Sequence, residues 1–159
     1  MNKRPVALLI IVIMLISLAS CSDGGYSYCE LSIPLDDGFV AVETEDFDRA
    51  FSDGEAVVAI LRISFAAANK EGFGEVMTPL EFGRFWTKRC GREADVQNEG
   101  GVFFASYYNG GTTGEDFYLE AFYRSKNAYF VVLFATTKSN EDEARVKFLD
   151  YASKVYFTE

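Results

Sequence analysis

Cysteines and carboxylates are the side chains with the most obvious chemical potential, because the sequence contains no histidine. The cysteines are Cys21, Cys29 and Cys90, and 24 acidic side chains outnumber 15 basic ones. Without histidine, the chain cannot form a Ser-His-Asp triad, a Cys-His pair or a histidine-ligated zinc site. It also lacks the commonest general base near neutral pH. We therefore assign no catalytic residues, and the composition favours a protein that is not an enzyme.

Cys21 ends a segment that looks like a secretion leader. Lys3 and Arg4 precede an apolar run from Val6 to Leu18. That run is about thirteen residues long, whereas a membrane-spanning helix needs roughly 20, so it is typical of a signal peptide. The residues Leu18-Ala19-Ser20-Cys21 resemble the lipobox of bacterial lipoproteins.

The lipobox resemblance implies that residues 1–20 are removed as a signal peptide and that Cys21 carries the lipid. Stable anchoring requires two or more acyl chains, such as palmitate, and lipoproteins of this kind carry them on the cysteine. We expect residues 21–27 to form a tether and residues 28–159 a single domain. The domain would lie on the extracytoplasmic face of the plasma membrane or the outer membrane. The alternatives are a secretory signal cut elsewhere and a short uncleaved anchor.

The predicted mature chain is strongly acidic. Loss of Lys3 and Arg4 lowers the 15 basic side chains to 13 against 24 acidic ones, a formal net charge of −11. Such a surface repels phosphate backbones and anionic headgroups. We therefore expect no nucleic-acid partner, and membrane attachment only through acylated Cys21.

Cys29 and Cys90 are a possible disulfide, because an extracytoplasmic compartment permits disulfides to form. A bridge between them would close a loop of about sixty residues and stabilise the fold by a few kcal/mol. Two buried thiols are the main alternative. A third is a reactive Cys90, since Lys88 and Arg89 precede it and cations lower a thiol pKa.

Apolar patterns predict strands over residues 29–33, 39–42, 47–51, 56–65, 102–108, 117–124 and 129–137. Residues 56–65 and 129–135 are apolar on both faces, so these two strands should be central. Thr78-Pro79-Leu80-Glu81 predicts a helix start with a capping box, and Gly91 its end. A second helix should begin at Ser139 or Asn140 and reach Val155, while residues 66–77 should form a loop.

This order of elements resembles the PsbP-like fold, in particular the small DcrB-like and PsbP-like lipoproteins of bacteria. The residues that carry the resemblance are Leu31-Ser32-Ile33-Pro34, Ala56–Phe65 before the Thr-Pro-Leu-Glu helix, the hairpin ending at Thr137, and Glu141–Val155 running into Tyr156-Phe157. The resemblance implies an α+β fold, a PsbP-like sandwich in which two main helices flank an antiparallel sheet of about six strands. It implies no common activity, because members mostly bind other proteins or assist assemblies.

Other patterns suggest few functional sites. The acidic residues Glu43, Glu45, Asp46 and Asp48 do not follow the EF-hand spacing, and Gly110–Gly114 lacks the Lys-Ser/Thr of a phosphate-binding loop. The sequence thus predicts neither a metal site nor a cofactor. Aromatic side chains beside acids are typical of partner-binding surfaces. Four candidates of this kind are Phe73, Tyr107, Tyr108 and Tyr118.

The sequence therefore favours a lipid-anchored envelope lipoprotein that acts as a non-enzymatic protein-binding or accessory module. The alternative is a solute-binding or substrate-processing, hydrolase-like lipoprotein, which would require a deep pocket with converging polar groups.

Overall fold

The computed structural model describes residues 30–73, 76–111, 114–136 and 141–158. The N-terminal segment that contains the predicted signal peptide, Cys21 and Cys29 lies outside the described residues. None of the helices in the described ranges is long and apolar enough to span a membrane.

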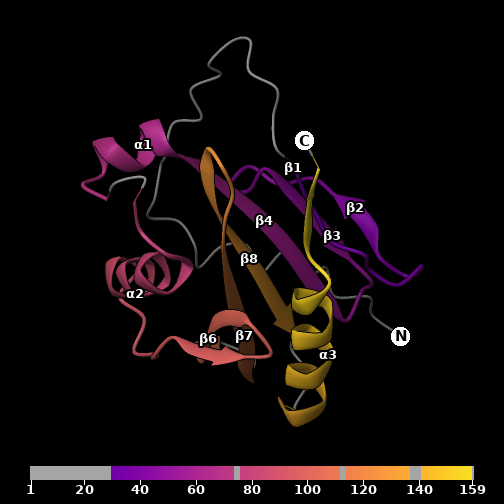
Figure 1. Cartoon of the computed structure of the whole chain (residues 1–159). Coiled ribbons are helices and arrows are strands. Elements are labelled where there is room, and N and C mark those ends of the chain that lie inside the picture. The colour runs from indigo at the N-terminus through magenta and orange to yellow at the C-terminus, as the bar shows by residue number, and fades with distance from the viewer. Residues whose placement is uncertain (1–29, 74–75, 112–113, 137–140, 159) are drawn as a thin grey trace.

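Seven antiparallel strands form the main sheet, in the order β2-β3-β4-β8-β7-β6-β5 (Figure 1). Their bounds are β2 Val40–Val42, β3 Arg49–Ser52, β4 Ala56–Ser64, β5 Gln97–Glu99, β6 Val102–Gly111, β7 Gly114–Arg124 and β8 Ala128–Thr136. β1 (Glu30–Ser32) and β9 (Tyr156–Thr158) pair in a separate two-stranded sheet. The helices are α1 Phe65–Lys70, α2 Pro79–Arg89 and α3 Glu141–Ser153. The predicted α+β fold, an antiparallel sheet with two main helices, is confirmed.

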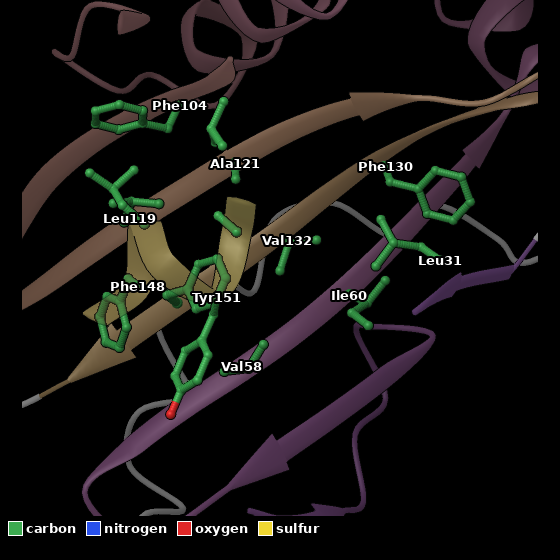
Figure 2. Packing of buried hydrophobic residues seen from close by; sticks show 14 of the residues in the cluster. Leu31, Val58, Ile60, Phe104, Leu119, Ala121, Phe130, Val132, Phe148 and Tyr151 are labelled. Atoms are coloured by element: carbon green, nitrogen blue, oxygen red, sulfur yellow. The ribbon is translucent and has the colours of Figure 1, made fainter. Parts of the chain in front are cut away.

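The main sheet separates two apolar layers. α3 and the β1–β9 pair cover one face, and α1 and α2 cover part of the other (Figure 1). Figure 2 shows the first layer, with Leu31 of β1 at one end and Phe148 and Tyr151 of α3 at the other. The second layer is rich in aromatic rings. Its largest buried members are Phe73, Phe82, Trp86, Phe122 and Tyr129.

β4 and β8 are central, as their two apolar faces predicted. They pair over nine residues, from Ala56 opposite Thr136 to Ser64 opposite Ala128. Every residue of β8 is buried. A strand that is apolar on both faces must be shielded from water on both sides. The two apolar layers bury both faces of β8.

α2 begins as the sequence predicted. The Thr78 hydroxyl accepts a hydrogen bond from the Glu81 backbone N–H at 3.3 Å, and the Glu81 carboxylate accepts one from the Thr78 N–H at 2.8 Å. This reciprocal capping box satisfies two N–H groups that the helix itself cannot. Cys90 caps the other end, and Gly91 follows with a φ of 66°, a left-handed conformation that favours glycine.

Gly83 sets how closely α2 approaches the sheet. A Cβ atom at this position would lie 2.6 Å from Cδ2 of Phe122, a ring that is buried on β7. Phe82 packs edge-on against the same ring at 6.0 Å between centroids, so the ring has little room to move. The absence of a side chain at Gly83 therefore brings the helix into contact with β7.

Gly83→Ala is expected to destabilise the protein by about 1–3 kcal/mol, because the new methyl overpacks the contact with Phe122. Helix propensity alone predicts the opposite, a gain of about 1 kcal/mol. Urea denaturation of wild type and variant measures the difference. Arg84→Ala, on the exposed side of the same helix, is the control and should change stability by less than about 0.5 kcal/mol. A more stable Gly83→Ala protein would contradict the close approach.

Several details of the predicted architecture were wrong. Residues 65–70 form α1 rather than a loop, because the Ser64 hydroxyl caps the helix by accepting the Ala67 N–H at 3.1 Å. β1 does not open the main sheet but pairs with β9, and Arg49 of β3 donates to the Leu31 carbonyl at 2.9 Å. The glycine-rich segment continues β6 to Gly111, and β5 and β9 were not predicted.

Candidate functional site

The four aromatic candidates occupy three different places in the structure. Tyr107 of β6 and Tyr118 of β7 lie opposite each other on the α2 side of the sheet and stack, with ring centroids 5.4 Å apart and planes at 7°. Tyr108 lies on the α3 side, where it is 47% exposed and donates a hydrogen bond to the Glu141 carboxylate. Phe73 is 2% exposed between α1 and α2, so its ring is not available at the surface.

The stacked tyrosines belong to a buried polar group centred on Glu120. Glu120 is on β7, two residues beyond Tyr118 on the same face, and is 4% exposed. Its carboxylate accepts a hydrogen bond from the Tyr107 hydroxyl at 3.0 Å, and Nη2 of Arg92 is 3.7 Å from it. The Arg92 guanidinium also lies over the Tyr107 ring, 4.7 Å from its centroid. We call Arg92, Tyr107, Tyr118 and Glu120 the Glu120 cluster.

Burial dominates the electrostatics of the Glu120 cluster. It raises the pKa of Glu120, and Arg92 and the Tyr107 hydroxyl offset only part of this effect. Trp86 also acts in the offsetting direction, although its indole N–H forms no hydrogen bond of standard geometry. Burial and the charge of Glu120 likewise raise the pKa of Tyr107, and burial together with Asp116 raises that of Tyr118 to about 12. Both tyrosines are therefore protonated at neutral pH.

Cys90 follows α2 and borders the Glu120 cluster. Burial and the Glu120 charge raise the pKa of this thiol to about 11, and the opposing effects of Arg92 and Arg89 are smaller. The thiolate is the nucleophilic form, so Cys90 is a weak nucleophile at neutral pH, contrary to the reactive-thiol alternative. Cys90 is a free cysteine in the structure, while Cys29 lies outside the described residues. The Cys29–Cys90 disulfide stays a prediction.

The side chains of the Glu120 cluster are held mainly by contacts with one another. The carboxylate, guanidinium and hydroxyl contact one another on the α2 side of the sheet, while Oε2 of Glu120 and Nε of Arg92 are buried without a hydrogen-bond partner. Among the described residues, no group of three or more cysteine, aspartate or glutamate side chains is placed to hold a metal ion. The arrangement fixes the packing of β6 against β7 and the segment after α2.

Glu120 and Arg92 were missed by the sequence analysis. The signal for Glu120 was present, because it alternates with Tyr118 and Phe122 on a strand that faces a helix. A carboxylate in that position must either be exposed or find a partner. Arg92 could not be assigned to it, because its position depends on how the segment after Gly91 folds back across the sheet.

Comparisons with known proteins concern the fold. No protein-family model matches the chain, and no curated protein matches it significantly. A crystal structure from Bacteroides thetaiotaomicron VPI-5482 is similar with a TM-score of 0.55 and 8% identity, over 81% of this chain and 45% of that one. This chain thus spans less than half of that protein. The solution structure of cyanobacterial PsbP (CyanoP) from Synechocystis sp. PCC 6803 has a TM-score of 0.49 and 13% identity, over 86% and 98% of the two chains.

Proposed function

We propose that this chain is a lipid-anchored protein of the cell envelope whose domain binds a protein partner, or serves as an accessory module, without catalysing a reaction. The observation that carries the proposal is the orientation of its side chains. The reactive types gather in the Glu120 cluster, where they contact one another, whereas several apolar side chains face outward. The exposed large apolar residues of the described chain are Val40, Val42, Val76, Tyr108, Val146 and Tyr156.

Exposed valines and tyrosines on an acidic surface suit recognition of another protein. A partner that removes these side chains from water gains the free energy of apolar burial, and tyrosine is enriched among the residues that carry most of the energy of protein interfaces. The resemblance of the sequence to PsbP-like lipoproteins supports the same class of function, because members of that family mostly bind other proteins or assist assemblies.

Chemical cross-linking in intact cells, followed by purification of the full-length protein in detergent, tests the binding function. We expect a cross-linked protein partner in near-stoichiometric amount. Recovery of the protein alone, under conditions in which a known envelope complex is captured, would count against a binding role.

Cys21→Ala is expected to move the protein from the membrane fraction to the soluble extracytoplasmic fraction, because the acyl chains would be the membrane attachment. Fractionation with immunoblotting measures the shift, which should be nearly complete. Intact-mass analysis of the wild type should show the added mass of diacylglycerol on Cys21. Cys90→Ala is the matched control and should stay membrane-bound. Wild-type protein without acyl mass would contradict the anchor.

A further inference from the structure

The sheet ends at β2, and this edge is apolar and exposed. β3 pairs with β2 on one side, and no other described strand pairs with it on the other (Figure 1). All three residues of β2 are exposed, with Val40 at 63% and Val42 at 39%. A sheet edge presents backbone N–H and C=O groups that another strand can pair with.

The opposite edge of the same sheet provides an internal comparison. β5 is also three residues long and exposed, but its residues are the polar Gln97, Asn98 and Glu99. Glu99 forms an ion pair with Arg145 of α3 at 2.7 Å. Polar and charged side chains are a common protection of sheet edges against unwanted pairing. β2 carries two valines where β5 carries polar groups, so the two edges differ in their capacity to accept a strand.

The two valines lie on the same face of the sheet. Val40 is opposite Ser52 and Val42 is opposite Ala50, and directly opposed residues of antiparallel strands point to the same side. Ala50 is in turn opposite Ala59, which is opposite Leu133. Val42 therefore extends an apolar row that crosses the sheet on the α2 side, and Val40 lies beside it on the same face. A strand added at β2 would place its own apolar side chains at the end of this row.

Acidic residues flank β2 at both ends. Asp36 and Asp37 precede it, and Glu43, Glu45 and Asp46 follow it, all of them exposed. Lys147 lies 3.9 Å from Asp36, but no ion pair among the described residues involves Glu43, Glu45 or Asp46. The negative charge at the two ends is complementary to a segment that is basic at both of its ends.

We infer that β2 accepts an extended segment of a partner protein, aliphatic in the middle and carrying lysine or arginine at both ends. The inference rests on the proposed binding function and specifies its partner. A second copy of this chain does not fit, because antiparallel pairing of two β2 strands would oppose acidic flanks to acidic flanks. The formal net charge of −9 adds to that repulsion.

A synthetic peptide tests the chemistry of this edge. The probe is the capped, fluorescein-labelled peptide Lys-Arg-Val-Thr-Val-Thr-Val-Arg-Lys, titrated into the full-length protein in detergent and followed by anisotropy. Its binding should slow hydrogen exchange at residues 40–42. A peptide with glutamate and aspartate in place of the basic residues should not bind. Binding without protection of β2 would overturn the inference.

Two sets of variants separate the edge from general charge effects. The double change Val40→Lys with Val42→Lys should weaken binding of the basic peptide roughly ten-fold or more, while Val146→Lys, at an exposed valine of α3, should not. Glu43→Lys with Glu45→Lys should weaken binding, while Glu93→Lys with Asp95→Lys, equally exposed, should have a much smaller effect. Equal losses in test and control variants would overturn the inference.

A photo-cross-linking residue at position 40, with position 98 of β5 as control, tests the inference in cells. Adducts at position 40 to a basic, strand-forming segment would support it. Adducts to a second copy, or to an acidic segment, would overturn it. If chemical cross-linking captures a partner but position 40 gives no adduct, the inference is overturned and the proposed function stands. Failure of both methods would count against the proposed function as well.

Discussion

Phe82→Ala is expected to lower the free energy of unfolding by about 3–5 kcal/mol, a large part of the 5–15 kcal/mol typical of a domain. Phe82 is fully buried and joins α2 to the sheet. Its ring stacks on Tyr129 at 4.4 Å between centroids, meets Phe122 edge-on at 6.0 Å and lies 5.8 Å from Phe73. Alanine would leave a cavity among rigid rings that cannot close around it.

Phe85→Ala is the matched control for this prediction. Phe85 is on the same helix but only partly buried, and its one ring contact in the described structure is with Phe73, at 4.7 Å. The same chemical change there should cost clearly less. Urea denaturation with equal slopes for the three proteins gives the comparison. Similar losses at the two positions would show that Phe82 is not the residue that holds α2 to the sheet.

Glu120→Gln is expected to remove a pH dependence of stability that the wild type shows. Burial raises the pKa of Glu120 in the folded state above its unfolded value of about 4.3. The folded protein therefore binds the proton more tightly, and this stabilisation is fully present below the unfolded pKa. It is lost as the pH rises through the folded pKa, by about 1.4 kcal/mol for each unit by which the pKa is raised.

Urea denaturation of the wild type and Glu120→Gln from pH 4 to pH 8 measures this effect. The difference in unfolding free energy between the two proteins should shift in favour of the variant as the pH rises. Other titrating groups, including Asp116 with its raised pKa, are common to both proteins and cancel in the difference. A constant difference for Glu120→Gln would contradict the raised pKa of Glu120 in the folded protein.

The elements that could be predicted from the sequence are those whose signals are local. The capping box of Thr78 and Glu81 forms its hydrogen bonds within four residues. The start of α2 could therefore be predicted from this short segment alone. The two-faced apolar runs of β4 and β8 similarly required a central position. The connection of the hairpin is confirmed as well, because Arg124 and Tyr129 form the last pair of β7 with β8 and residues 125–128 lie between them.

What could not be predicted depends on contacts between distant segments. β1 and β9 are three residues each. They form strands only by pairing with each other, for example Glu30 with Thr158. Because Phe73 stands between two glycines, the sequence suggested an exposed loop residue. In the structure it follows α1 and is buried in the apolar layer beneath α2. Glu120 has a signal in its alternation with aromatic residues. Its partners come from β6 and from the segment after α2, which a single strand cannot reveal.

The burial of every residue of β8 bears on how the domain unfolds. β8 contributes alternate side chains to the layer under α3 and to the layer under α2. Detachment of either helix from the sheet would therefore expose side chains of β8 to water. Separate opening of the two layers is therefore costly, and α2 and α3 should lose their structure in one cooperative transition. Edge strands β2 and β5 do not share this constraint. The chain thus combines a core that opens as a unit with margins that can exchange hydrogen bonds while the core stays intact.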